Sequence, residues 1–334
     1  MKKRRLCGNV LVNPMGFGGI PIQRISEKEA SAVLNACLDK GINFIDTARG
    51  YTDSEEKIGK AVSYRKKEFY VATKTLDRTK QGAMQDIKTS LKNLKIKKID
   101  LYQLHNIGNQ DDFERIMKAD GAYSGLKEAK ETGLIGHIGV TGHKPEFILK
   151  AIETGRFETI QIPFNIIEKQ FAKVIEKADE AGIGTIIMKP LAGGAFKNSE
   201  AALKWVMSQK VSVVIPGMQS LEEANKNSAL AENYELTKDE SERLAKEAKS
   251  MDKNICRRCE YCLRVCPQGI DITKTLLFHA YYKRYDLKEW AKKRYESVVK
   301  VKPDQCTECG ACEKECPYGL PIRKMLKEAR EDMG

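Results

Sequence analysis

The sequence predicts an α/β fold, a (β/α)8 TIM barrel followed by a second, smaller, mostly helical domain. Between residues 14 and 230, short apolar runs alternate with amphipathic stretches that have polar, glycine-marked ends, which is typical of repeated βα units. Eight of the ten cysteines lie between residues 256 and 316, after this alternation has stopped. The length of 334 residues exceeds the size at which a single core usually stops growing, so two domains are expected.

The barrel prediction depends on eight apolar runs that can each form a strand. The first helix has clear signals, because Ser26 and Glu29 form a capping-box pattern at its start and Gly41 stands at its end. An open doubly wound sheet is the alternative fold, but GFGGIPIQ (16–23) does not complete the glycine-rich phosphate loop that such sheets usually carry. The expected strands are 14–19, 43–48, 69–74, 100–105, 135–142, 159–165, 185–190 and 211–217.

The strand pattern stops after residue 230, and residues 237–251 are expected to form a surface helix. We therefore predict a barrel domain over 1–250 and a cysteine-rich domain over 251–334. With 41% apolar and 31% charged residues, the chain can bury a sizeable core, and no apolar stretch approaches the ~18 residues of a membrane span.

The charge and the N-terminal segment indicate where the protein works. The basic start MKKRR is not followed by the uninterrupted apolar segment of a signal peptide, so a soluble, cytoplasmic protein is expected. Although the net charge is +12, Lys and Arg are interleaved with Asp and Glu along most of the expected helices. Neither nucleic acid nor a membrane is therefore expected as a partner.

Four polar residues stand at or just after the ends of successive expected strands. Asp46 ends the second strand, Tyr51 lies in the loop after it, Lys74 ends the third strand and His105 ends the fourth. Taken singly, each has a structural explanation, such as helix capping or a solvated strand end. In a (β/α)8 barrel, however, the C-terminal ends of the strands meet on one face and build the active site. The four residues together therefore predict a catalytic site.

This set suits the delivery of a proton to a carbonyl oxygen while hydride arrives at the carbonyl carbon. A tyrosine can act as the acid, because a neighbouring ammonium group lowers the pKa of a phenol. Lys74 would supply that ammonium group and Asp46 would keep it charged and in place. His105 could hydrogen-bond the carbonyl oxygen and orient it.

Three segments resemble the signature segments of the aldo-keto reductase family: DTARGYTDSEEKIGKAV (46–62), ATK (72–74) and DLYQLH (100–105). The resemblance covers roughly residues 5 to 235. It implies a (β/α)8 barrel with a hairpin at its bottom, for which residues 3–13 are suitable. It also implies an NAD(P)H-dependent oxidoreductase that acts on an aldehyde or ketone, with Asp46, Tyr51, Lys74 and His105 as the catalytic tetrad.

The resemblance is weaker where the family binds the nicotinamide ring. Gln161 matches the position that contacts the carboxamide. The Ser-Asn pair of the family appears here as Thr141 and Gly142, so one carboxamide partner is lost. The aromatic residue on which the nicotinamide stacks in much of the family aligns with Met188, which is followed by Lys189.

The segment IPGMQSLEEANKN (215–227), which includes Gly217, resembles the part of the family that holds the adenosine end of the cofactor, with Asn227 in the matching place. A basic residue that often holds the 2′-phosphate aligns with Glu223. A carboxylate would repel this phosphate and could bind a ribose hydroxyl group, which favours NADH over NADPH. Lys226 could compensate, so both cofactors stay open.

The cysteine-rich domain contains one motif twice. CRRCEYCLRVCP and CTECGACEKECP each follow the pattern C-x2-C-x2-C-x3-C-P, with cysteines at 256, 259, 262 and 266 and at 306, 309, 312 and 316. Three closely spaced thiolates can hold one corner of a [4Fe-4S] cluster, while the fourth cysteine leads to the other cluster. A pair of structural zinc sites is the alternative, but zinc ribbons usually carry paired C-x2-C knuckles. We assign Cys256, Cys259, Cys262 and Cys316 to one cluster, and Cys306, Cys309, Cys312 and Cys266 to the other.

This domain resembles two-cluster bacterial ferredoxins, with one departure. A helical insert of 39 residues separates Cys266 from Cys306, as in the ferredoxin-like modules of larger redox enzymes. Residues 252–334 contain 18 Lys and Arg and 13 Asp and Glu, which gives a net charge of +5. A basic domain would attract an acidic ferredoxin or flavodoxin as an electron donor.

The sequence thus predicts an enzyme that reduces a carbonyl substrate, with an appended electron-transfer domain. Nicotinamides transfer two electrons as hydride, whereas clusters transfer one electron at a time, so direct exchange between them normally needs a flavin. The alternatives are therefore a ferredoxin-linked reductase that uses flavin, and a non-catalytic redox sensor or electron carrier. The complete tetrad argues against the second alternative.

Overall fold

The computed structural model describes residues 3–251, 254–258, 260–284 and 287–334. The chain divides into two compact units, and each is described separately. The first unit contains Met1–Asn165, Lys169–Pro190 and Glu200–Thr237, and the second contains Ile166–Glu168, Leu191–Ser199 and Lys238–Gly334.

This division differs from the boundary near residue 250 that the sequence predicts. The helix α10 (Lys238–Met251) and two short segments of the barrel portion group with the C-terminal residues. Hydrogen bonds explain the grouping, because Glu247 of α10 accepts the backbone N–H groups of Lys197 and Asn198. Arg257 likewise donates from its Nε to the carbonyl oxygen of Ile167, at 3.2 Å.

The first unit is a (β/α)8 barrel, as predicted. Its eight parallel strands pair in chain order, and the parallel bridges Met15–Val214 and Gly18–Gly217 join the first strand to the last. Each strand lies inside its predicted range or within one residue of it. The strands are β3 (Phe17–Gly18), β4 (Phe44–Asp46), β5 (Tyr70–Thr75), β6 (Ile99–Leu104), β7 (Ile135–Thr141), β8 (Thr159–Pro163), β9 (Gly184–Met188) and β10 (Val213–Val214).

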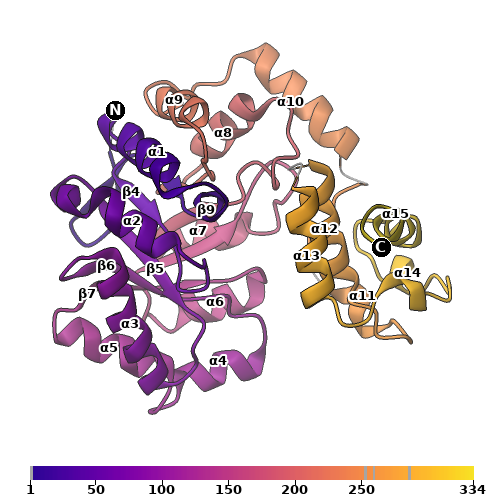
Figure 1. Cartoon of the computed structure of the whole chain (residues 1–334), viewed down its shortest axis with the longest axis horizontal. Helices are drawn as coiled ribbons and strands as arrows, with labels where there is room; N and C mark the ends of the chain where they lie inside the picture. Colours follow the sequence, from indigo (N-terminus) through magenta and orange to yellow (C-terminus); the bar gives the residue numbers. More distant parts are fainter. Residues whose placement is uncertain (1–2, 252–253, 259, 285–286) are drawn as a thin grey trace. The chain divides into compact units, whose positions relative to one another are not determined.

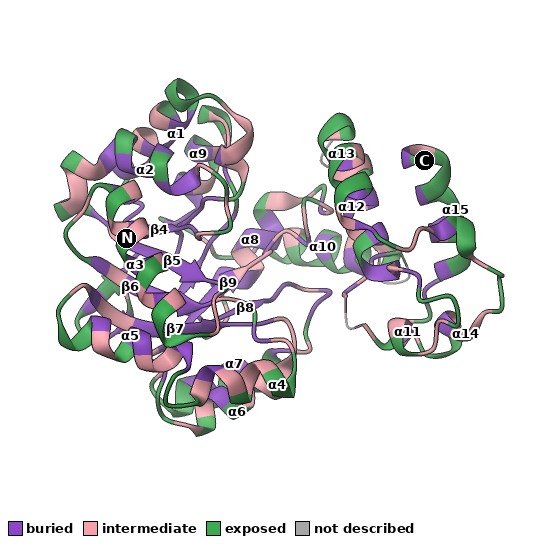
Figure 2. Cartoon of the chain, turned by 60° about the horizontal axis from the view of Figure 1, so that its bottom comes forward, coloured by how far each residue is buried: buried purple, intermediate pink, exposed green. Residues whose placement is uncertain are grey.

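Helices surround these strands (Figure 1), and the buried residues lie on the strands and on the helix faces turned toward them (Figure 2). The capping box of Ser26 and Glu29 starts the first α-helix, α1. The helices of this unit are η1 (Pro21–Arg24), α1 (Glu27–Asp39), α2 (Ser54–Val62), η2 (Ser63–Glu68), α3 (Lys80–Leu94), α4 (Gln110–Met117), α5 (Ala122–Glu131), α6 (Pro145–Glu153), α7 (Ala172–Glu180), α8 (Ser199–Met207) and α9 (Leu221–Leu230).

The predicted hairpin precedes the barrel. Strands β1 (Arg4–Cys7) and β2 (Val10–Val12) are antiparallel. Leu6 and Val12 pack with Phe44 and Leu101 in a core cluster at one end of the barrel. A side chain at Gly184 would overlap the backbone oxygen of Leu6, so the hairpin lies directly against β9. The hairpin therefore fills the barrel bottom, opposite the strand ends that carry the polar residues.

The second unit is helical. Its core combines apolar side chains of the insert and of the C-terminal helix with six cysteines, three from each motif among the described residues: Cys256, Cys262, Cys266, Cys306, Cys312 and Cys316. Among the described residues, no helix combines the length and the apolar character that crossing a bilayer requires. In addition to α10, its helices are α11 (Tyr261–Arg264), α12 (Ile272–Arg284), α13 (Lys288–Val298), η3 (Pro303–Gln305), α14 (Ala311–Lys314) and α15 (Ile322–Met333).

Candidate active site and cluster loops

Asp46 and Lys74 form a buried ion pair at the C-terminal ends of β4 and β5. The Lys74 Nζ lies 2.8 and 2.7 Å from the two carboxylate oxygens of Asp46 and donates to the carbonyl oxygen of Thr47 at 2.7 Å. The side chain of Lys74 is only 1% exposed and that of Asp46 only 4%. Burial lowers the pKa of Lys74, and the Asp46 carboxylate opposes this change by stabilising the ammonium form. The lysine is therefore rigidly held and surrounded by oxygen atoms.

Tyr51 lies beside this pair. The Lys74 Nζ is 5.2 Å from the centroid of the Tyr51 ring. The rings of Tyr51 and His105 meet edge to face, with centroids 5.9 Å apart and an interplanar angle of 81°. The structure thus brings together all four residues that the sequence predicts as the tetrad.

His105 is neutral at ordinary pH. Burial, together with the positive charges of Lys74, Arg78 and Lys189, lowers the pKa of His105 to about 3. Its Nδ1 is buried and has no hydrogen-bond partner among the described residues. A neutral imidazole can donate one hydrogen bond to a carbonyl oxygen without offering a competing acidic proton.

Glu55 is a buried carboxylate near Lys74 that the sequence analysis missed. It accepts hydrogen bonds from Thr73 Oγ1 and Ser90 Oγ, both at 2.7 Å, and from Arg49 Nη1 at 2.6 Å. Its charge also raises the pKa of Lys74 against the effect of burial. A signal existed, because Glu55 stands three and seven residues before the apolar Ile58 and Val62 and so lies on the inner face of α2.

Two residues expected to contact a nicotinamide carboxamide make internal hydrogen bonds. Gln161 Oε1 accepts from Gln103 Nε2 at 2.8 Å, and Gln161 Nε2 lies 3.4 Å from Asp46 Oδ2. Thr141 Oγ1 accepts the backbone N–H of Asn106 at 2.8 Å. The hydroxyl group of Thr141 and the second amide hydrogen of Gln161 could each donate a hydrogen bond to a carboxamide oxygen.

The end of β9 carries Met188 and Lys189, which the sequence predicts near the nicotinamide. Met188 and Lys189 follow each other there, and Lys189 has a left-handed backbone with a φ of 55°. The Lys189 Nζ lies 2.7 Å from His143 Nε2, and His143 Nδ1 lies 3.0 Å from Asn106 Oδ1. The side chains of Lys189, His143 and Asn106 therefore form a continuous row of contacts between the segments that follow β9, β7 and β6.

The residues expected at the adenosine end lie around the start of α9. Glu223 Oε2 accepts the backbone N–H groups of Gln219 at 2.7 Å and Ser220 at 3.1 Å, so this carboxylate caps the helix. Asn227 is half-buried, one turn further along α9. Gly217 lies against Pro21, and a Cβ atom at this position would come within 2.5 Å of the proline ring. The role of Glu223 toward a ribose stays a prediction.

In the second unit, four cysteines line one pocket. They are Cys306, Cys309 and Cys312 of the second motif and Cys266 of the first, which is the set that the sequence assigns to one cluster. Cys309 is exposed and Cys312 is buried. The backbone N–H of Ile270 donates to Cys266 Sγ, and that of Glu308 donates to Cys306 Sγ, both at 3.4 Å. Such bonds are typical of cysteines that hold an iron-sulfur cluster.

The first motif repeats the backbone of the second. Arg258 and Glu260 have left-handed backbones, as do Glu308 and Gly310 at the equivalent positions. Turns of this kind direct successive N–H groups into a concave surface that suits an anion. Cys256, Cys262 and Cys316 join Cys266, Cys306 and Cys312 in one core cluster, and Cys259 lies outside the described residues.

Comparison with known proteins agrees with this arrangement. The model of the aldo/keto reductase family matches residues 14–201, and that of a 4Fe-4S dicluster domain matches residues 255–321. The chain belongs to the aldo/keto reductase family. The prediction of an aldo-keto-reductase-like, NAD(P)H-dependent oxidoreductase is thereby confirmed at the level of the family, and the predicted fusion to an iron-sulfur domain is confirmed as well.

Relatives with curated names are distant. An uncharacterized oxidoreductase of Schizosaccharomyces pombe is 29% identical over 281 residues, which cover 73% of this chain and 90% of the relative. The aldo-keto reductase YhdN of Bacillus subtilis is 30% identical over 197 residues, which cover 53% of this chain and 56% of the relative. The similarity therefore identifies the family and leaves the substrate open.

Solved structures show the same barrel. An aldo-keto reductase of Bacillus halodurans in its holo form superposes with a TM-score of 0.66 at 23% identity and covers 77% of this chain and 99% of its own. An aldo/keto reductase of Klebsiella pneumoniae in complex with NADP and acetate gives a TM-score of 0.64 at 21% identity, over 73% of this chain and 94% of its own. At these identities the likeness shows the fold.

Proposed function

We propose that this aldo/keto reductase reduces a small aldehyde or ketone with hydride from NAD(P)H, that Tyr51 is the proton donor, and that the C-terminal domain holds two [4Fe-4S] clusters for electron transfer. The observation that carries the proposal is the cluster of Tyr51, the buried Lys74–Asp46 pair and the neutral His105. The four residue types are those that a hydride-dependent carbonyl reduction needs on the side of the proton.

Tyr51, Lys74 and His105 each have a different role in the protonation of the carbonyl oxygen. When bound, the nicotinamide supplies the hydride that forms the new C–H bond. Tyr51 gives its phenolic proton to the oxygen, which becomes the hydroxyl group of the product, and takes a proton from solvent afterwards. Lys74 stabilises the phenolate that Tyr51 leaves behind, and His105 donates a hydrogen bond that fixes the carbonyl oxygen before the transfer.

Thr141 ends β7, and Gln161 lies beside it in the middle of β8; these two residues would hold the nicotinamide. Thr141 and Gln161 both have a donor hydrogen left for the carboxamide oxygen. The Klebsiella pneumoniae structure was solved with NADP. Because Glu223 is engaged as a helix cap, its charge is a weak guide to the choice between NADH and NADPH.

The cysteines suit two clusters with shared ligation. Cys266 lines the pocket of the second motif, which supports the assignment of Cys266, Cys306, Cys309 and Cys312 to one cluster. Cys256, Cys259, Cys262 and Cys316 would hold the other. Clusters in these sites supply one-electron transfer.

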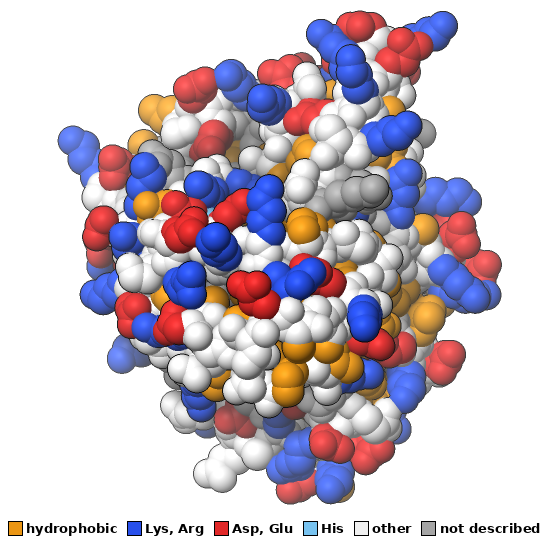
Figure 3. Space-filling model, turned by 90° about the vertical axis from the view of Figure 1, so that its right-hand side faces the viewer, with side chains coloured by type: hydrophobic (Ala, Val, Ile, Leu, Met, Phe, Trp, Pro, Cys, Tyr) orange, Lys and Arg blue, Asp and Glu red, His pale blue; other side chains and the backbone are white. Residues whose placement is uncertain are grey.

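An acidic ferredoxin or flavodoxin is the partner that the charges favour. On the face shown in Figure 3, Lys and Arg side chains are interspersed with fewer Asp and Glu. Exposed basic residues lie on α12, on α13 and just after α13, where Trp290 is also 38% exposed. Charge complementarity of this kind accelerates association with an acidic carrier. These exposed basic residues are Lys283, Lys288, Lys293, Arg294 and Lys300.

A ferredoxin-linked reductase that uses flavin is the second candidate. Met188 cannot offer the aromatic face on which a nicotinamide stacks in much of the family, and Lys189 reaches His143 beside it. A flavin would also connect hydride chemistry with one-electron clusters. This candidate predicts flavin in the purified protein and reduction of the clusters by nicotinamide.

The test is anaerobic purification followed by iron, sulfide and flavin analysis, and by assays with NADH and NADPH against 4-nitrobenzaldehyde and 9,10-phenanthrenequinone. We expect about eight irons, no flavin, and turnover of at least one carbonyl probe. Flavin together with clusters that bleach on addition of NADH or NADPH would favour the second candidate. Bound nicotinamide without turnover of either probe would contradict carbonyl reduction.

The shared ligation has its own test. Replacement of Cys266 by alanine should reduce the iron content from about eight to about four and remove the electron paramagnetic resonance signal of one cluster. Cys37→Ala, which changes a buried cysteine of α1, is the matched control and should keep all the iron. Loss of both clusters in a folded Cys266→Ala protein would contradict the assignment.

A further inference from the structure

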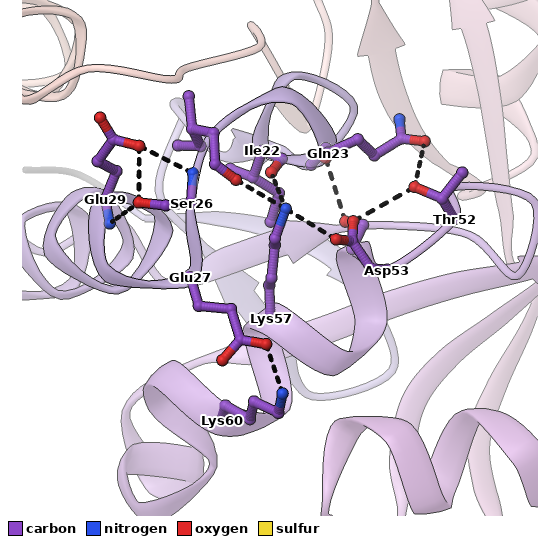
Figure 4. Close-up of polar contacts among 12 residues, drawn as sticks. Ile22, Gln23, Ser26, Glu27, Glu29, Thr52, Asp53, Lys57 and Lys60 are labelled. Atoms are coloured by element: carbon purple, nitrogen blue, oxygen red, sulfur yellow. Dashed lines mark hydrogen bonds and ion pairs between the residues drawn. The ribbon is translucent and has the colours of Figure 1, made fainter.

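Lys57 is a buried lysine on α2 that the proposed chemistry does not use. Its side chain is 6% exposed, and its Nζ lies 2.9 Å from Asp53 Oδ2. The same Nζ donates to the backbone carbonyl oxygens of Ile22 at 2.9 Å and Ile25 at 2.8 Å (Figure 4). Burying an ammonium group is costly unless its hydrogens find acceptors, and here three oxygens surround it. The lysine thus joins α2 to the connection between β3 and α1.

Two further contacts join the same two segments. Thr52 Oγ1 donates to Gln23 Oε1 at 3.0 Å, as Figure 4 shows, and Ser54 Oγ donates to the carbonyl oxygen of Gly19 at 3.1 Å. Thr52 of the β4–α2 loop, and Ser54 and Lys57 of the first turns of α2, therefore link this region to the β3–α1 connection. Of these three ties, only Lys57 brings a full charge into a buried position.

The β4–α2 loop, which contains Tyr51 and Thr52, is strained. Thr52 has a φ of 34°, a left-handed conformation that a β-branched residue rarely adopts. Tyr51 precedes it and takes part in the same turn, because its N–H donates to Ala48 and its carbonyl oxygen accepts from Ser54. Strained turns persist only where the surrounding contacts hold them. The ties to the β3–α1 connection supply such contacts.

The position of Tyr51 depends on this loop more than the positions of its partners do. Asp46 and Lys74 belong to strands of the sheet, and His105 directly follows β6. Tyr51 alone stands five residues beyond the end of its strand, so the path of the loop sets the distance of 5.2 Å between its ring and the Lys74 Nζ.

We infer that Lys57 is a positioning residue for Tyr51, since its buried ammonium group holds the strained Tyr51 loop in the conformation that places the phenol beside Lys74. The inference deepens the proposed role of Tyr51 as the proton donor and rests on it. A sequence pattern alone does not reveal it, because a lysine in SEEKIGKAV is equally compatible with the solvated face of the helix.

Lys57→Gln tests the inference, with Lys57→Arg as the conservative variant and Lys60→Gln as the control. Lys60 lies on the same helix and pairs with Glu27 at the surface (Figure 4), so its loss removes a charge without touching the Tyr51 loop. We expect kcat for the carbonyl probe to fall about 10- to 100-fold in Lys57→Gln, while KM for the nicotinamide cofactor stays the same. Lys57→Arg should recover part of kcat, and Lys60→Gln should match the wild type.

A second readout does not need turnover. Full-length protein labelled with 3-fluorotyrosine gives a fluorine NMR signal for Tyr51, which is assigned by its absence in Tyr51→Phe. We expect one sharp signal in the wild type and in Lys60→Gln, and a shifted, broadened or split signal in Lys57→Gln. If the wild type reduces neither carbonyl probe, the proposed function fails, and this signal still decides whether Lys57 positions Tyr51.

Two results would overturn the inference. One is a Lys57→Gln protein with an unchanged fluorine signal and an unchanged kcat. The other is a fall in kcat that Lys60→Gln reproduces, which would indicate a general effect of charge on α2. If Lys57→Gln does not fold, Asp53→Asn takes its place, because it neutralises the carboxylate that pairs with Lys57. An unchanged Tyr51 signal and an unchanged kcat in that variant would then overturn the inference.

Discussion

The two halves of the barrel mouth, at the ends of β4 to β6 and of β7 to β9, differ in the contacts that their predicted site residues make. At the ends of β4 to β6, the tetrad residues contact one another and the charged pair is completely buried. At the ends of β7 to β9, Thr141 and Gln161 bind other protein groups, and Lys189 contacts His143. The four residues of the proposed tetrad are thus held against one another, whereas the residues expected to bind the cofactor make contacts with other protein groups. Variants that separate the two halves test this difference.

The largest effect is expected for Tyr51→Phe. Because this change removes only the acidic proton of the tetrad half, kcat for the carbonyl probe should fall about 10²- to 10⁴-fold, while the Kd of NADH or NADPH stays within a factor of two. Steady-state kinetics and fluorescence titration measure the two quantities. A Tyr51→Phe protein that keeps wild-type kcat would show that the proton comes from elsewhere.

Lys74→Met should lower both activity and stability. The change leaves the Asp46 carboxylate buried without its cation, which costs about 3–5 kcal/mol in the free energy of unfolding. The double variant Asp46→Asn, Lys74→Met removes the unpaired charge and should recover most of that stability without recovering activity. Denaturant unfolding and kcat report the two effects, and a double variant with restored kcat would mean that the pair serves stability alone.

The depressed pKa of His105 predicts how stability depends on pH. In the folded protein the pKa of this imidazole is about 3, so it stays neutral until the pH approaches that value. In the unfolded chain a histidine titrates near ~6.5. Between these values the unfolded chain binds more protons, so this contribution is complete above the unfolded pKa and is lost as the pH falls through this range. His105→Gln should flatten the slope of unfolding free energy against pH there. A His105 signal that titrates near 6.5 in nitrogen NMR would contradict the prediction.

The smallest effect is expected for Glu223→Ala in the cofactor half. Loss of the helix cap should cost about 1 kcal/mol in the free energy of unfolding. The ratio of KM values for NADH and NADPH should not change, because the carboxylate caps α9. A selective rise in KM for NADH would show instead that Glu223 contacts the ribose.

The sequence predicts the fold and the convergence of the four proposed tetrad residues, because both depend on local pattern and on family signatures. The eight strands follow from apolar runs, and Asp46, Tyr51, Lys74 and His105 follow from their places at the strand ends. The association of Cys266 with the second motif was also predictable, since the spacing of the motif implies it. These features need no knowledge of side-chain direction.

The buried charges of Glu55 and Lys57 were not predicted, because their partners are backbone groups or residues far away in the chain. Lys57 donates to the backbone carbonyl oxygens of Ile22 and Ile25. Every residue has such an oxygen, so the sequence does not indicate which ones a lysine will contact. Glu223 is a different case, since Ser220 and Glu223 form a capping-box pattern that was visible in the sequence and indicated a helix cap before any contact with a cofactor.

The most direct test of the central claim is to trace the hydride. The protein is mixed anaerobically with NADPH or NADH that carries deuterium at the transferring position of C4, and with 4-nitrobenzaldehyde, and the alcohol is analysed by mass spectrometry. Direct transfer beside Tyr51 predicts one deuterium on the former carbonyl carbon in the wild type and almost no alcohol from Tyr51→Phe. Unlabelled alcohol, with the deuterium lost to water and the clusters reduced, would contradict direct transfer and indicate a path through flavin.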